Sequence, residues 1–159
     1  MTITSPFPLE LVPLAWQWLQ EFPQANFDDY GPQTFNQFEP HMQWRVTTER
    51  TWAVFKEGQP CGVVGYAPIT PRLGALHGIC FAKGLCTRDE KREAVRLILR
   101  ELFDSGVAKI CATFFADNSK IGPFLSDLGA LEEGYLRQHT LRDGQPINMV
   151  QVAIFSSRV

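Results

Sequence analysis

One stretch of the chain, residues 74–103, constrains the fold most, because it predicts a buried strand followed by a capped helix. Residues 75–82 are mostly apolar and lie between glycine-containing turns, a pattern typical of a strand buried on at least one face. Thr87 and Glu90 then form a Thr-x-x-Glu capping box, in which each side chain bonds the backbone amide of the other residue. A helix is therefore expected to begin here.

The predicted helix has a clear apolar face and a clear end. Ser105-Gly106 supplies a stop signal, and apolar residues recur before it at helical spacing: Ala94, Val95, Leu97, Ile98, Leu99, Leu102 and Phe103. A buried strand that leads directly into a helix presents unpaired backbone N–H groups and the positive end of the helix dipole, which favour a bound anion. This geometry is common in phosphate and cofactor sites, but by itself it does not require one.

The flanking segments predict an α/β chain. Two helices are expected first, over 9–22 and 33–45, the second interrupted or restarted at Pro40. Further strands are expected over 51–56, 61–69, 108–116, 131–141 and 147–155, with a short helix over 121–128. The strand–helix–strand order in the centre implies a right-handed crossover between two parallel strands.

Composition excludes several classes of partner. With 159 residues, of which 45% are hydrophobic, the chain is expected to form a single domain over 1–159. A formal net charge of -2 without long charged blocks argues against nucleic-acid and membrane partners. The amino end lacks the pattern of a signal peptide, and no apolar run reaches the ~20 residues of a membrane span. A cytoplasmic location is therefore expected.

The four cysteines, Cys61, Cys80, Cys86 and Cys111, have no metal-ligand spacing, so no metal site is expected. Reduced thiols that serve as small buried apolar groups are the expected state. Cys86 differs from the others because it precedes a helix amino end, where the pKa of a thiol tends to fall.

Several short motifs in the second half resemble the GNAT superfamily, the acetyl-CoA-dependent N-acetyltransferases, and in particular the branch related to ribosomal-protein N-terminal acetyltransferases. The resemblance covers residues 51–155. Its residues are Cys61-Gly62-Val63-Val64-Gly65, the helix from Glu93-Ala94 to Leu102-Phe103, Ala116-Asp117-Asn118, Leu128-Gly129-Ala130, Glu133-Gly134-Tyr135-Leu136-Arg137 and Asp143-Gly144.

This resemblance implies a GNAT-like α/β fold with a mixed, mostly antiparallel sheet that is splayed between its two central parallel strands. It implies that acetyl-CoA binds in the groove between these strands. The cofactor-binding residues expected from the resemblance are Phe81, through backbone donors around it, together with Thr87, Arg88, Lys91, Arg92 and Asn118.

The loop that should hold the pyrophosphate departs from the family pattern. Family members have an Arg/Gln-x-x-Gly-x-Gly/Ala loop, which falls here on residues 86–91, and both glycines are missing. Asp89 and Glu90 would oppose a multiply charged anion at the helix start. Arg88, Lys91 and Arg92 could compensate in part. The sequence therefore predicts the helix start well and describes a degenerate phosphate loop.

The catalytic groups are equally altered. The family's Tyr or Ser proton donor would fall on Leu125 or Ile121, and neither can give a proton. His77 is the titratable residue at a place comparable to the family's base, and an imidazole is a competent base near neutral pH; the alternative is a hydrogen-bonded structural histidine. Asn118 either caps the short helix or lies near the cofactor arm. His41 could touch a substrate or lie on the surface.

Four arginines recur every four residues along the central helix. This stripe is either an anion-binding track or, as we favour, a solvated face of ion pairs with nearby acids. The arginines are Arg88, Arg92, Arg96 and Arg100, and the acids are Asp89, Glu93 and Asp104.

Three functions remain open from the sequence. The first is transfer of an acetyl group from acetyl-CoA to a small-molecule amine or a protein N-terminus. The second is a non-catalytic binding or assembly module with the GNAT fold that has lost acetyl-CoA binding. The third is a ligand sensor with an aromatic pocket in its amino-terminal helices. The apolar strand at 150–155 is a candidate for pairing across a homodimer interface.

Overall fold

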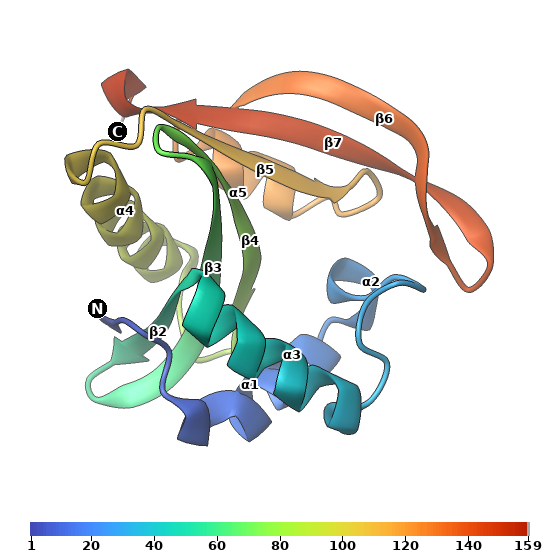
Figure 1. Cartoon of the computed structure of the whole chain (residues 1–159), viewed down its shortest axis with the longest axis horizontal. Helices are drawn as coiled ribbons and strands as arrows, with labels where there is room; N and C mark the ends of the chain where they lie inside the picture. Colours follow the sequence, from blue (N-terminus) through green and yellow to red (C-terminus); the bar gives the residue numbers. More distant parts are fainter. Residues whose placement is uncertain (159) are drawn as a thin grey trace.

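The computed structural model describes residues 1–158 and is built on one seven-stranded sheet with the order β1-β2-β3-β4-β5-β7-β6 (Figure 1). The strands are β1 (Thr2–Thr4), β2 (Arg50–Lys56), β3 (Gln59–Thr70), β4 (Leu73–Phe81), β5 (Lys109–Phe115), β6 (Leu131–Arg142) and β7 (Gln145–Phe155). The helices are η1 (Leu9–Leu11), α1 (Val12–Gln20), α2 (Pro23–Asn26), α3 (Phe35–Thr48), α4 (Arg88–Asp104), α5 (Ile121–Ser126) and η2 (Ser156–Arg158).

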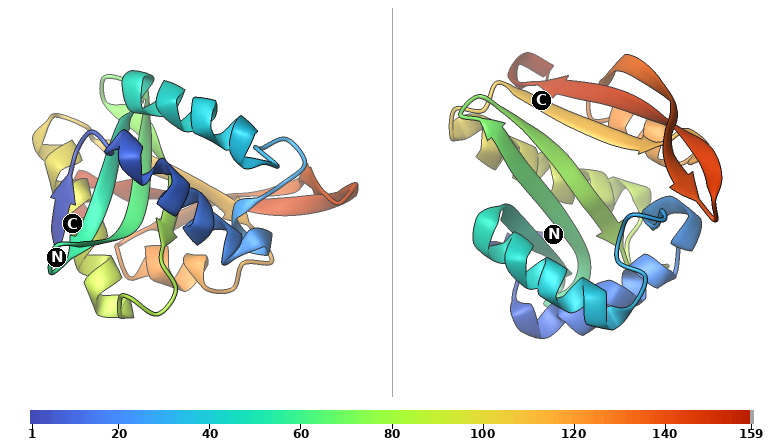
Figure 2. Two further views of the ribbon diagram at one scale, coloured as in Figure 1. Left: turned by 90° about the horizontal axis from the view of Figure 1, so that it is seen from below. Right: turned by 45° about the vertical axis from the view of Figure 1, so that its right-hand side comes forward.

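The central strands β4 and β5 are the parallel pair, and every other pairing in the sheet is antiparallel. Their pairing begins at Leu73 with Lys109 and ends at Ala75 with Cys111. Beyond that point the strands diverge, and the sheet opens into a V between β4 and β5 (Figures 1 and 2). The expected mixed, mostly antiparallel sheet, splayed at its parallel centre, is confirmed.

A bulge in β4 lies just beyond the last paired residues. The β3–β4 register shifts between Val63 and Gly65, so that Gly78 and Ile79 of β4 together face one residue of β3. Gly78 has a φ of +58°, in the left-handed region that favours glycine. Bulges bend the strand that carries them, which accounts for β4 turning away from β5.

Two apolar layers cover the two faces of the sheet. On one face α4 and α5 pack through residues such as Ile98, Leu102 and Leu125. On the other face α1 and α3 pack on β2–β4 (Figure 2), and the rings of Trp16 and Phe38 lie 5.1 Å apart. Trp16, Trp18 and Phe38 therefore supply core, whereas Trp44 on α3 is exposed. Within residues 1–158 no helix is long and apolar enough to span a membrane.

The break expected in the second helix at Pro40 is wrong. Helix α3 is continuous through Pro40 and extends to Thr48. A proline removes one i→i−4 hydrogen bond, here near the amino end of the helix, while the buried Phe38 and Met42 on either side of it hold both turns against the sheet. Strand β1 was not predicted, because three residues carry too little pattern; its pairing with β2 is what forms it.

The start of α4 matches the expectation in detail. Thr87 is the N-cap, its hydroxyl accepts a bond from the Glu90 amide, and the Glu90 carboxylate accepts from the Thr87 amide at 2.8 Å. Both halves of the capping box are present.

Replacing the capping hydroxyl tests this helix start. We expect Thr87→Ala to lower the free energy of unfolding by about 1 kcal/mol, because the Glu90 amide loses its acceptor. Urea denaturation followed by circular dichroism measures the change. Thr87→Ser keeps the hydroxyl and should retain most of the stability; an equal loss in both variants would contradict the capping account.

Candidate functional site

A cleft of about 1110 Å³ occupies the opening between β4 and β5. Its walls include the bulged end of β4, residues 112–115 of β5, the start of α4, one side of α5, the cleft-facing side of α3 and the loop before α3. Of the residues expected at the site, His77, Phe81, Arg88, Lys91 and Asn118 line the cleft. Thr87, the N-cap of α4, and Arg92 in its second turn are not among the lining residues.

Lysine 56 on β2 holds the carboxylate of the capping box. Lys56 Nζ lies 2.9 Å from a carboxylate oxygen of Glu90 and donates to the Leu85 carbonyl at 3.3 Å. The hydrogen bond from Lys56 to the Glu90 carboxylate, and then the bond from the Thr87 amide, lower the pKa of Glu90 to about 2. The negative charge that the sequence places at the helix start is therefore matched by a cation from another strand.

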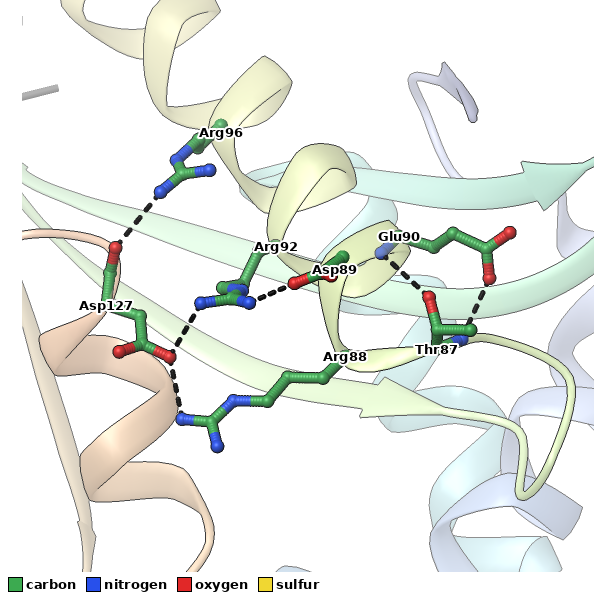
Figure 3. A network of polar contacts seen from close by, with 7 residues as sticks. All are labelled: Thr87, Arg88, Asp89, Glu90, Arg92, Arg96 and Asp127. Atoms are coloured by element: carbon green, nitrogen blue, oxygen red, sulfur yellow. Dashed lines mark hydrogen bonds and ion pairs between the residues drawn. The ribbon is translucent and has the colours of Figure 1, made fainter.

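Three of the four arginines of the stripe on α4, Arg88, Arg92 and Arg96, contact one residue at the end of α5, as Figure 3 shows. Asp127 Oδ2 lies 2.7 Å from Arg88 Nη2 and 2.9 Å from Arg92 Nη1. The Asp127 carbonyl accepts from Arg96 at 3.1 Å, and Arg92 also pairs with Asp89. Arg88 and Arg92 are thus ion-paired, in line with the interpretation favoured from the sequence. Within residues 1–158, however, Asp89 is the only one of the three expected acids that pairs with them, and their main partner, Asp127, comes from beyond α4.

Lys91 is the cation at the start of α4 that points toward the strand. It lines the cleft, with its Nζ 5.8 Å from the centre of the Phe81 ring. The Ala82 amide donates to Cys61 O, toward β3. Because backbone groups alternate in direction along a strand, the Phe81 amide faces the opposite side, toward the cleft. This is the strand-edge donor expected around Phe81.

The short helix α5 forms an apolar wall of the cleft. Ile121 and Leu125, the positions at which the resemblance implies a proton donor, both line it. The Asn118 side-chain oxygen accepts from the amides of Lys120 at 3.2 Å and Ile121 at 3.3 Å. Asn118 therefore caps the start of α5 and also contributes to the cleft wall. Its place near a cofactor arm stays a prediction.

His77 lies beside a carboxylate that the sequence did not identify. His77 Nε2 is 2.8 Å from Glu49 Oε2, although the ring is not oriented for a hydrogen bond, and both ring nitrogens are buried. The same Glu49 oxygen lies 3.7 Å from Arg45 Nε. Gly65 makes room for the imidazole, because a Cβ there would come within 2.5 Å of the ring.

The environment keeps His77 uncharged at neutral pH. Burial, then the charges of Arg45 and His41, lowers the pKa of His77 to about 3. Burial also raises the pKa of Glu49, with Arg45 acting against that rise. Despite the short contact between the two side chains, removal from water is the dominant effect on each. The pair therefore has a neutral imidazole beside a carboxyl that holds its proton more tightly than usual.

A loop and a hairpin meet at the open side of the molecule. The Asp29 carboxylate, in the loop before α3, accepts from the amides of Asp143 and Gly144, each at 2.8 Å. The Asp29 amide donates to Leu141 O at 2.8 Å. Asp28 also accepts from the Thr140 hydroxyl at 2.7 Å. The turn between β6 and β7 thus fixes the loop that borders the cleft.

Arg45 and Glu49 were missed from the sequence for a specific reason. The second helix was expected to end at Arg45, so the last turn of α3, which places both residues against β4, was not considered. His41 and Arg45 are four residues apart and both line the cleft. This i, i+4 spacing of two polar residues on a mostly aromatic helix was the sequence signal that could have indicated a polar face of α3 at the site.

Comparison with known proteins identifies the fold. No protein-family model matches the chain, and no curated protein matches its sequence. A ribosomal-protein-alanine N-acetyltransferase from Brucella melitensis has a TM-score of 0.79 and 16% identity over 98% of this chain and 99% of that one. A spermidine N-acetyltransferase variant from Vibrio cholerae has a TM-score of 0.82 and 17% identity over 99% and 96%.

A third structure names the class directly. A probable acetyltransferase of the GNAT family from Chromobacterium violaceum has a TM-score of 0.75 and 20% identity over 96% of this chain and 86% of that one. The chain therefore has the GNAT acetyltransferase fold. The resemblance expected from its sequence is confirmed at the level of the fold, and ribosomal-protein acetyltransferases are among the structures that share it.

The lowered pKa of His77 can be tested through the pH dependence of the free energy of unfolding. Between the unfolded pKa near 6.5 and the folded value of about 3, the unfolded chain binds a proton that the folded chain does not. Stability should therefore fall as the pH is lowered through this window, by up to roughly 1.4 kcal/mol for each pH unit. In His77→Gln the slope of unfolding free energy against pH should be smaller.

The exposed His139 on β6 provides the matched control. His139→Gln should keep the slope of the unsubstituted protein in urea titrations between pH 7 and pH 4. The pKa of Glu49 is raised in the fold, so above its unfolded pKa of about 4.5 the folded chain holds a proton that the unfolded chain has lost. Glu49 therefore makes the unfolding free energy increase as the pH is lowered in that range, opposite to His77. Equal slopes in His77→Gln and in the unsubstituted protein would show that His77 titrates normally in the fold.

Proposed function

We propose that this chain is an acetyl-CoA-dependent N-acetyltransferase that binds its cofactor in the cleft between β4 and β5. The observation that carries the proposal is the parting of the two parallel strands after Ala75 and Cys111, which exposes the edge of β4 to a cleft of about 1110 Å³. The start of α4 borders the same cleft. An extended ligand with an anionic end fits a strand edge that leads to a helix amino end.

The cofactor would lie along β4 with its pyrophosphate at α4. The backbone donor of Phe81 faces the cleft and suits the amide groups of the pantetheine arm. Lys91 and Arg88, both on the cleft wall, suit the phosphates. Asn118, opposite them at the start of α5, would lie along the same arm.

The missing glycines leave a limited set of phosphate donors. The amides of Thr87 and Glu90 are used within the capping box, so the amides of Arg88 and Asp89 would face the anion. Lys56 offsets the charge of Glu90. In this arrangement side-chain cations replace part of the backbone cradle that glycines provide in relatives.

The reaction would be direct transfer. The amine nitrogen attacks the thioester carbonyl carbon, a C–N bond forms, and the C–S bond breaks to release the CoA thiolate. We assign to His77 the orientation of a water that takes the amine proton, because the neutral imidazole can accept a hydrogen bond, whereas its pKa of about 3 makes it a weak proton acceptor itself. Glu49 Oε2, 2.8 Å from Nε2, would lie beside the imidazole in this step. Ile121 and Leu125 supply no acid, so the thiolate would take its proton from solvent.

A second candidate function, a binding module without cofactor, is favoured by the network in Figure 3. Asp127 already neutralises Arg88 and Arg92, and Asp89 pairs with Arg92. A protein that no longer binds a pyrophosphate would be free to use these arginines to fix α4 to α5. Acetyl-CoA binding distinguishes the two functions.

Isothermal titration with acetyl-CoA tests the proposal. We expect saturable, micromolar binding that weakens roughly tenfold to a hundredfold in the double variant Arg88→Ala, Arg92→Ala, a total of about 1.4–2.8 kcal/mol. The loss is smaller than that of two full charge-assisted contacts, because both arginines are shared with Asp127. Arg100→Ala, on an exposed part of α4 away from the cleft, is the control and should bind normally. No heat at high micromolar acetyl-CoA, from protein shown to be folded, would favour the binding module.

A further inference from the structure

The acceptor end of the cleft has a cation placed against the bulge of β4. Arg45 of α3 lines the cleft. Its Nη1 lies 3.2 Å from where a Cβ on Gly78 would be, so the guanidinium sits directly beside the bulge. Under the proposed function, this is where an amine would meet the thioester, since β4 would hold the pantetheine arm up to that point.

The hydrogen bonding of Arg45 is incomplete. Its Nε is buried and has no hydrogen-bond partner among residues 1–158. The carboxylate of Glu49 lies 3.7 Å away, and the oxygen concerned is closer to His77, at 2.8 Å. A partly desolvated guanidinium with a spare donor gains most from a ligand that brings a carboxylate, because charge-assisted bidentate contacts are strong where water is scarce.

Free negative charge is scarce on the cleft wall. Asp29 is the one carboxylate among the described residues that line the cleft, and both of its oxygens already accept bonds from the β6–β7 turn. The cationic side chains on the wall are Arg45, Arg88, Lys91 and Lys120. Among the side chains that line the cleft, a polyamine acceptor would therefore find cations and no unengaged carboxylate, which is the wrong complement for its charges. Glu49 is not one of the lining residues, and its carboxyl has a raised pKa.

We propose that the acceptor is a primary amine with a carboxylate a few bonds from it, as in an α-amino acid, and that Arg45 binds this carboxylate. The inference rests on the proposed function. Arg45 would hold the acceptor with its amine beside Gly78 and His77, so that one anchor sets both affinity and direction. The acetyl group moves to nitrogen, the C–S bond breaks, and the products are the N-acetyl acid and CoA.

Matched acceptor pairs test the inference. Acetylation rates would be measured for the α-amino acids, for the corresponding α-amino acid amides, and for spermidine, using thiol release from acetyl-CoA. Binding of the same amines to the protein saturated with CoA would be measured by isothermal titration, a readout that needs no turnover. We expect acids to exceed their amides by roughly tenfold or more in kcat/KM and in affinity.

Substitution at Arg45 identifies the anchor. Arg45→Gln should lower kcat/KM for the preferred acid roughly tenfold to a hundredfold and leave its amide nearly unchanged, so that the preference disappears. Arg45→Lys keeps the charge and should retain part of the preference. Arg100→Gln, on the exposed side of α4, should behave as the unsubstituted protein.

The outcomes distinguish a failure of the acceptor inference from a failure of the proposed transferase function. Acetyl-CoA binding together with preferred acetylation of amides or spermidine would overturn the inference and leave the transferase standing. So would acetyl-CoA binding with no measurable binding of any acid, or an acid preference that survives in Arg45→Gln. Failure of folded protein to bind acetyl-CoA at all would overturn the proposed function, and the inference with it.

Discussion

The divergence of two parallel strands is the feature on which the rest of this structure depends. β4 and β5 stay paired only as far as Ala75 and Cys111, and the bulge at Gly78 then bends β4 away. The divergence leaves strand-edge donors without strand partners, which a sheet tolerates where a ligand or water replaces them. The start of α4, with Arg88 and Lys91, and the polar face of α3, with His41 and Arg45, both line the cleft that this divergence opens. The bulge in β4 thus helps to form both the proposed cofactor end and the proposed acceptor end of the cleft.

Under the proposed function, a bound pyrophosphate would compete with Asp127 for the arginines at the start of α4. Asp127 holds Arg88 and Arg92, and a bound pyrophosphate would have to replace that carboxylate or share the arginines with it. Exposed ion pairs of this kind are weak, so the exchange is energetically accessible. Lys56 acts in the opposite direction, because it pairs with Glu90 and reduces the repulsion that an acidic helix start imposes on an anion.

Local sequence patterns predicted much of the fold and only part of the site. The capping box at Thr87 and the strand–helix–strand order depend on neighbours in sequence, and both were read correctly. The contacts of Arg88 with Asp127, and of His77 with Glu49, join residues far apart in the chain, and no local pattern encodes them. Pro40 shows the same limit, because tertiary packing on either side of it outweighs a local helix-breaking signal.

Occupation of the opening between β4 and β5 by acetyl-CoA is best measured by titrating ¹⁵N-labelled protein with acetyl-CoA and following its amide chemical shifts. We expect saturable shifts in the amides of Ile79, Phe81, Arg88 and Asp89, with little change in the exposed strand β6. Shifts confined to other surfaces, or no shifts at saturating cofactor, would contradict it.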